Sequence, residues 1–143
     1  MNSLIALYRF SSYCRHRLKM RLVPALLYRI IRVVSSCELP YNTIIGRNTL
    51  FIHNGLGGVV HPKAVIGEGC RIYQNVTIGG RNGSEAPIIG NNVVIYAGAC
   101  VLGGIRIGDN AQVGANAVVI RDVAEGTVIG GIPAKELKKR TND

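Results

Sequence analysis

The chain has 143 residues, of which 48% are apolar, and it carries a formal net charge of +9 at pH 7. From this length we expect one domain with at most a small appendage and no second domain. Eighteen glycines, two phenylalanines and no tryptophan are typical of a narrow, evenly layered core. The four cysteines show no CxxC spacing and no secretion signal is recognisable, so we expect a cytoplasmic protein without a metal site.

Residues 1–37 are predicted to be a basic helical segment. Seven basic residues and no acidic ones lie in it: Arg9, Arg15, Arg17, Lys19, Arg21, Arg29 and Arg32. Pro24 favours the first position of a second helix. Apolar residues then recur at the spacing of one helical face, at Leu27, Ile30, Ile31 and Val34. The stretch is too short and too charged to span a bilayer.

Several roles are open for residues 2–36. The segment can dock on the rest of the chain or on a neighbouring subunit, which is the simplest interpretation. It can also lie peripherally at the inner face of the membrane, where apolar burial and the attraction of basic side chains add, or its charge can simply be solvated. Nucleic-acid binding is not expected, because no recognised module or run of stacking aromatic residues accompanies the charge.

From Ile45 the sequence repeats every six residues, with an aliphatic residue at one position and a small or medium apolar residue four places later. The aliphatic positions are Ile66, Ile72, Ile78, Ile89, Ile95, Val101, Ile107, Val113 and Val119. The later positions are Cys70, Val76, Val93, Ala99, Ile105, Ala111, Ala117 and Val123. This period predicts a β-helix of about four coils over residues 38–131, followed by a basic tail over 132–143.

Two interruptions break the repeat. Between Phe51 and Val60 the spacing is nine residues instead of six, in a glycine-rich stretch that contains His53. We expect a bulged corner there. The second interruption follows Gly80, where a polar, turn-rich sequence predicts a loop over 80–88 that leaves the coil and returns to it.

These landmarks, with the run Ile72–Gly80 and the closing Gly131–Lys135, resemble those of the hexapeptide-repeat acyltransferases, and within them the serine acetyltransferase-like branch. The resemblance covers residues 38–138. It implies an all-β fold, a left-handed parallel β-helix with a short N-terminal helical segment. It also implies a homotrimer with active sites between subunits, where acetyl-CoA binds as the co-substrate.

Within this resemblance His53 matches the general base of the family. Acetyl transfer to a hydroxyl needs a group that removes the hydroxyl proton, and a neutral imidazole is suited to this at neutral pH. Glu38, fifteen residues earlier, matches the carboxylate that orients this histidine, although an acidic residue at this point can equally be solvated. His16 is interpreted as structural or solvated, and His61 has no catalytic counterpart in the family.

The resemblance also implies an acetyl-CoA site. The matching positions are Gly79, Gly80, Ala97, Gly98, Ala115, Arg121, Lys135 and Lys138. Small residues would leave room for the pantetheine arm, and main-chain N–H groups at Ala97 and Gly98 would stabilise the oxyanion. The basic side chains would contact the phosphates. Small residues in a β-helix also serve packing alone.

The acceptor is inferred from differences. Serine acetyltransferases carry an Asp before the catalytic His and an Arg-His pair in the loop, whereas this chain has Ile52 and Glu85–Ala86. Their long N-terminal helical domain is also replaced by the short basic segment. These differences predict acetylation of a sugar hydroxyl, on a small molecule or a lipid-linked glycan, in capsule or exopolysaccharide biosynthesis. Serine O-acetylation in cysteine biosynthesis is the alternative, and a non-catalytic β-helix scaffold is the second alternative.

Overall fold

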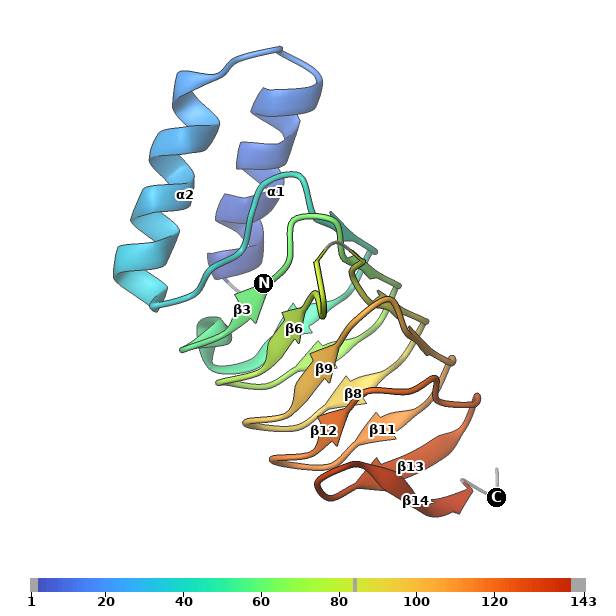
Figure 1. The fold of residues 1–143 in the computed structure, drawn as a ribbon. Coiled ribbons are helices and arrows are strands. Elements are labelled where there is room, and N and C mark those ends of the chain that lie inside the picture. The colour runs from blue at the N-terminus through green and yellow to red at the C-terminus, as the bar shows by residue number, and fades with distance from the viewer. Residues whose placement is uncertain (1–2, 84, 140–143) are drawn as a thin grey trace.

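A computed structural model describes residues 3–83 and 85–139 of the chain. It consists of a helical hairpin, α1 (Ser3–His16) and α2 (Leu22–Ser35), followed by a parallel β-helix (Figure 1). The short strands of the β-helix are β1 (Ile44–Ile45), β2 (Leu50–Phe51), β3 (Val59–Val60), β4 (Val65–Ile66), β5 (Arg71–Ile72), β6 (Thr77–Gly79), β7 (Ile88–Ile89), β8 (Val94–Ile95), β9 (Cys100–Leu102), β10 (Arg106–Ile107), β11 (Gln112–Val113), β12 (Val118–Val119) and β13 (Thr127–Gly130).

Three parallel sheets form the faces of the β-helix, with the strand orders β1-β4-β7-β10, β2-β5-β8-β11-β13 and β3-β6-β9-β12. Each strand pairs with the equivalent strand one coil away, as Phe51 does with Ile72 and Ile72 with Ile95. Because each coil gives one strand to each sheet, the four-stranded sheets correspond to about four coils. The parallel β-helix predicted from the six-residue period is therefore confirmed.

The core follows the repeat directly. Every aliphatic and every small apolar position of the hexads between Ile66 and Val123 is buried. Strand side chains alternate between the two faces, so a fixed period places the same two positions of each hexad inside. Corners between strands are filled by residues with positive φ, among them Asn75, Asn92 and Asn116.

The helical hairpin docks on the first coil through α1. Leu4, Ile5 and Tyr8 are buried, and the Tyr8 hydroxyl donates to the Thr43 carbonyl. Arg9 donates from Nη2 to the Gly46 carbonyl at 3.2 Å. The basic segment is thus docked on the β-helix, which agrees with the simplest of the interpretations given for residues 2–36.

α2 packs mainly on α1 and differs from expectation in two ways. It begins at Leu22, two residues before Pro24, which was expected to be its first residue. Of the predicted apolar stripe, Ile31 is buried while Val34 is 75% exposed. The reason is that α2 has one neighbouring helix rather than a sheet to cover it, so much of its apolar surface faces outward.

The residues after Gly131 were expected to form a tail. Instead β14 (Lys135–Lys139) turns back and pairs with β13 in antiparallel fashion. Residues 140–143 of the predicted tail lie outside the described residues. Neither helix in the described part of the chain has the length and apolar content that crossing a bilayer would require.

Candidate active site at the His53 corner

The nine-residue interruption forms a bulged corner, as predicted. After β2 the chain makes a short 3-10 segment, Ile52–Gly55, in which His53 and Asn54 have φ values of 55° and 54°. This left-handed conformation is uncommon for residues other than glycine, although Asn and His adopt it more readily than most. Ser3 of α1 contacts the same corner, since its hydroxyl lies 3.2 Å from Asn54 Oδ1. The His53 side chain is exposed at the surface.

The later coils have an equivalent corner below the bulged one, and several of the predicted site residues lie at these equivalent corners. Ala97 and Gly98 follow β8, and Ala115 follows β11. A main-chain hydrogen bond from Asn116 N–H to the Ala97 carbonyl, 2.9 Å long, connects two successive coils here. The structure therefore places Ala97, Gly98 and Ala115 in one column with His53, because β2, β5, β8 and β11 are stacked in one sheet.

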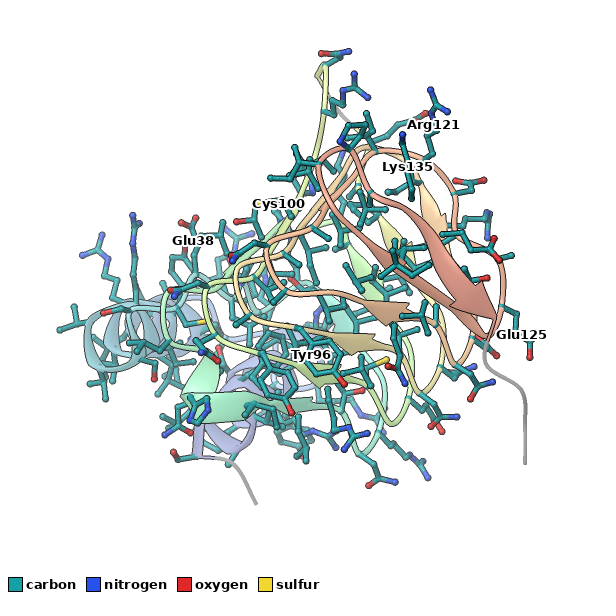
Figure 2. The ribbon with its side chains drawn as sticks, turned by 90° about the horizontal axis from the view of Figure 1, so that it is seen from below. Glu38, Tyr96, Cys100, Arg121, Glu125 and Lys135 are labelled. Carbon is teal, nitrogen blue, oxygen red and sulfur yellow. The ribbon has the colours of Figure 1, made fainter. Side chains whose placement is uncertain are left out.

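Two tyrosines that the sequence analysis did not assign to the site lie in this column. The rings of Tyr73 and Tyr96 have their centroids 5.3 Å apart and are tilted by 34° (Figure 2 labels Tyr96). Tyr73 directly follows β5 and Tyr96 directly follows β8, so the two tyrosines occupy the same position of their hexads. This shared position was the sequence signal that could have placed them in one column. Gln74 follows Tyr73 and occupies the position between His53 and Ala97 in the column, and its Oε1 is buried and accepts no hydrogen bond from the described residues.

Only part of the expected oxyanion site is available in the main chain. The Gly98 N–H donates to the Gln74 carbonyl at 3.1 Å, so it is already used between coils. No described hydrogen bond uses the Ala97 N–H. Gly98 itself has φ +73°, and a Cβ there would lie 2.1 Å from Asn116 Oδ1, so only glycine fits at this position. The expected pair of donors is reduced to Ala97.

The predicted loop lies at a different corner. Gly79 ends β6 and Gly80 begins the excursion that returns at β7. A Cβ on Gly80 would lie 3.7 Å from the ring of His61, so this histidine packs against the start of the loop. The loop also covers the next coil, because a Cβ on Gly104 would lie 2.1 Å from Glu85 Oε2.

The basic residues predicted to bind phosphate lie near the end of the β-helix. Arg121 and Lys135 line one groove together with Pro133 and Ala134. Figure 2 labels the two basic residues, which lie on the same side of the molecule. Both side chains are exposed. Lys138 lies in β14, where its backbone pairs with Val128, and its side chain is outside the described structure.

Glu38 has partners on α2. Its Oε1 accepts a hydrogen bond of 3.0 Å from the Tyr28 hydroxyl, and its Oε2 lies 3.9 Å from Arg32 Nη2. Desolvation, followed by the neighbouring Glu38 carboxylate, raises the pKa of Tyr28. Sequence reasoning missed Tyr28 and Arg32, because neither helix packing nor the direction of the Glu38 side chain can be read from the hexad pattern.

The main chain of Glu38 lies beside the strand that leaves the His53 corner. Its N–H donates to the Gly58 carbonyl at 2.8 Å, and its carbonyl accepts from the Val60 N–H at 2.9 Å. Within the described residues no hydrogen bond joins the Glu38 and His53 side chains. The orientation of His53 by Glu38 stays a prediction. The described residues contain no cluster of three or more His, Cys, Asp or Glu side chains that could hold a metal ion.

Comparison with known proteins gives a consistent result. Residues 86–121 match the family described as bacterial transferase hexapeptide (six repeats). The chain is 37% identical to a serine acetyltransferase of Helicobacter pylori strain J99 over 131 residues, which are 90% of this chain and 76% of the relative. It is 39% identical to a serine acetyltransferase of Synechococcus elongatus over 120 residues, which are 82% of this chain and 49% of the relative.

Solved structures show the same similarity. A serine acetyltransferase of Neisseria gonorrhoeae superposes with a TM-score of 0.88 at 30% identity, over 98% of this chain and 55% of that one. A serine acetyltransferase in complex with CoA superposes with a TM-score of 0.84 at 33% identity, over 94% and 55% of the two chains. The chain thus spans about half the length of these structures and of the Synechococcus relative.

Proposed function

The chain belongs to the serine acetyltransferase branch of the bacterial hexapeptide transferases, and we propose that it transfers the acetyl group of acetyl-CoA to the hydroxyl of serine. The observation that carries this proposal is the exposed His53, which the bulged corner presents at the top of a column containing Ala97 and Ala115. Acetyl-CoA as the donor is supported by the solved serine acetyltransferase complex with CoA.

The sugar acceptor predicted from the sequence is wrong. That prediction rested on Ile52 and Glu85–Ala86, which replace residues that hold serine in the family. Relatives at 37% to 40% identity are nevertheless consistently serine acetyltransferases. Serine is a zwitterion, and its charges can be held by charged groups on other elements or on a neighbouring subunit. Differences at a few positions of the sequence therefore do not determine the acceptor. The expected role in capsule or exopolysaccharide biosynthesis and the expected lipid-linked glycan partner both depended on the sugar acceptor, so they are withdrawn with it.

In the proposed reaction His53 acts as the general base. Its imidazole accepts the proton of the serine hydroxyl while the oxygen attacks the thioester carbonyl carbon. The Ala97 N–H is the main-chain donor at this corner that can stabilise the oxyanion. As the carbon–sulfur bond breaks, the imidazolium returns the proton to the leaving thiolate. The carboxylate of Glu38 would stabilise the charged ring if it turned from α2 towards His53.

The proposed site is shared between subunits of a homotrimer. Within one chain, His53 lies at the corner from which the strands of the sheet β3-β6-β9-β12 begin, and the loop after Gly80 lies at the corner where these strands end. Residues expected to contact one acetyl-CoA molecule therefore fall on two corners, together with the groove of Arg121 and Lys135. A neighbouring subunit that presents its second corner to the His53 corner would unite them, and a donor from it could satisfy Gln74 Oε1.

The direct test is turnover. The purified full chain is mixed with acetyl-CoA and L-serine, and release of the CoA thiol is followed together with formation of O-acetylserine. We expect turnover that saturates in both substrates. A folded, trimeric protein that acetylates other hydroxyl compounds but not serine would overturn the serine acceptor, and one that acetylates nothing would favour a scaffold.

A further inference from the structure

The connection between α1 and α2 lies at the end of the hairpin away from the β-helix (Figure 1). Residues 17–22, here called the hairpin tip, alternate basic and apolar side chains in the order Arg-Leu-Lys-Met-Arg-Leu. All six are exposed, and among the apolar ones Leu18 is 53%, Met20 40% and Leu22 86% exposed. The described chain leaves Leu22 almost uncovered, and it leaves about half of Leu18 and of Met20 exposed.

The apolar surface continues from the tip along α2. Leu26, one helical turn after Leu22, is 60% exposed. Leu22, Val23, Ala25, Leu26 and Arg29 line a shallow, mainly apolar hollow on this side of the helix. Contiguous exposed apolar surface of this kind marks sites of interaction with proteins or membranes.

The charge around this surface has one sign. Residues 1–37 hold seven basic residues and no acidic ones. Arg17, Lys19 and Arg21 of the tip form no ion pair with any described residue, whereas Arg32, near the other end of α2, approaches Glu38. A surface that combines exposed leucines with unpaired cations is complementary to a layer that is anionic outside and apolar beneath.

We propose that the hairpin tip binds an anionic lipid surface, with Leu18, Met20 and Leu22 entering the headgroup region and the three basic residues contacting lipid phosphates. A second copy of this chain fits the same surface less well, because it would bring two clusters of positive charge together. Nucleic acid would use the cations but leave the leucines exposed to water. The inference does not depend on the acetyl acceptor.

The chain contains no tryptophan, which allows a reporter at a single position. In the variant Leu22→Trp we expect the fluorescence to shift to shorter wavelength with vesicles of phosphatidylcholine and phosphatidylglycerol, and not with phosphatidylcholine alone. The matched control is Leu137→Trp, because Leu137 is 67% exposed and lies on β14 at the far end of the β-helix. Binding should weaken as salt is raised.

Two sets of substitutions separate the contributions in a vesicle flotation assay. Leu18→Ser with Leu22→Ser, and Arg17→Gln with Lys19→Gln and Arg21→Gln, should each weaken binding to the anionic vesicles at least tenfold. The proposal fails if the parent does not float with anionic vesicles. It also fails if duplex DNA binds and only the charge variant loses it, or if Leu22→Trp shifts in the absence of vesicles as the protein is concentrated.

Discussion

The hydroxyl of Tyr28 on α2 donates a hydrogen bond of 3.0 Å to Oε1 of Glu38, the carboxylate expected to orient His53. The main chain of Glu38 is at the same time bonded to the strand that leaves the His53 corner. The helical hairpin and the first coil are therefore connected through Glu38.

Replacement of His53 tests the general base. We expect His53→Ala to lower kcat for acetyl transfer by at least about a hundredfold, because general-base catalysis contributes this much or more. His16→Ala is the matched control, since His16 is an exposed histidine at the end of α1, and its kcat should stay close to that of the parent. Equal losses in both variants would argue against a specific role of His53.

Replacement of Glu38 tests the orienting carboxylate. Glu38→Gln keeps an oxygen that can accept from Tyr28 but removes the charge that would stabilise a protonated His53. We expect kcat to fall at least about tenfold with little change in the KM for acetyl-CoA. An unchanged kcat would show that Glu38 serves only to attach α2 to the first coil.

Removal of the Tyr28 hydroxyl should destabilise the fold. Tyr28→Phe loses the hydrogen bond to Glu38 and should lower the free energy of unfolding by about 1 kcal/mol, measured by urea denaturation. Tyr41→Phe is a suitable control, because Tyr41 is half-buried and lines the same pocket beside Glu38. If both variants lose the same stability, the bond to Glu38 is not the cause.

We expect the groove of Arg121 and Lys135 to affect the affinity for acetyl-CoA rather than the rate of the chemical step. We expect Arg121→Gln with Lys135→Gln to raise the KM for acetyl-CoA about tenfold while kcat is largely kept, and the effect should shrink at high salt. Arg106→Gln, an exposed arginine on β10, should leave this KM unchanged. A loss in kcat alone would place these cations elsewhere in the mechanism.

Cys37 should make the free energy of unfolding depend on pH in the alkaline range. Burial, with a smaller effect of the Glu38 carboxylate, raises the pKa of its thiol from 9.0 to about 12. Between these values the folded state holds a proton that the unfolded state loses, so the free energy of unfolding should fall as pH rises from about 9 to about 12. Denaturation of the Cys37→Ala variant should show a smaller slope, by up to about 1.4 kcal/mol per pH unit. An unchanged slope would assign the dependence to other groups.

The repeat allowed the β-helix and its core to be predicted residue by residue, because side-chain direction in a strand depends only on position along the chain. The bulge at His53 was predictable for the same reason, since extra residues in a hexad have to leave the coil. The occupied N–H of Gly98 and the Tyr73–Tyr96 pair were not predictable in detail, since both involve contacts between successive coils.

The six-residue period was enough to predict the coil, the buried positions, the two interruptions and the presence of His53 at a corner. These features are local, and a fixed six-residue period carries them. Three features became visible only in the folded chain: Glu38 turns to Tyr28 and Arg32, the closing residues return as a strand, and the leucines of the hairpin tip stay exposed. Each of these depends on how separate elements pack against one another, and the spacing of residues along one chain does not contain that information.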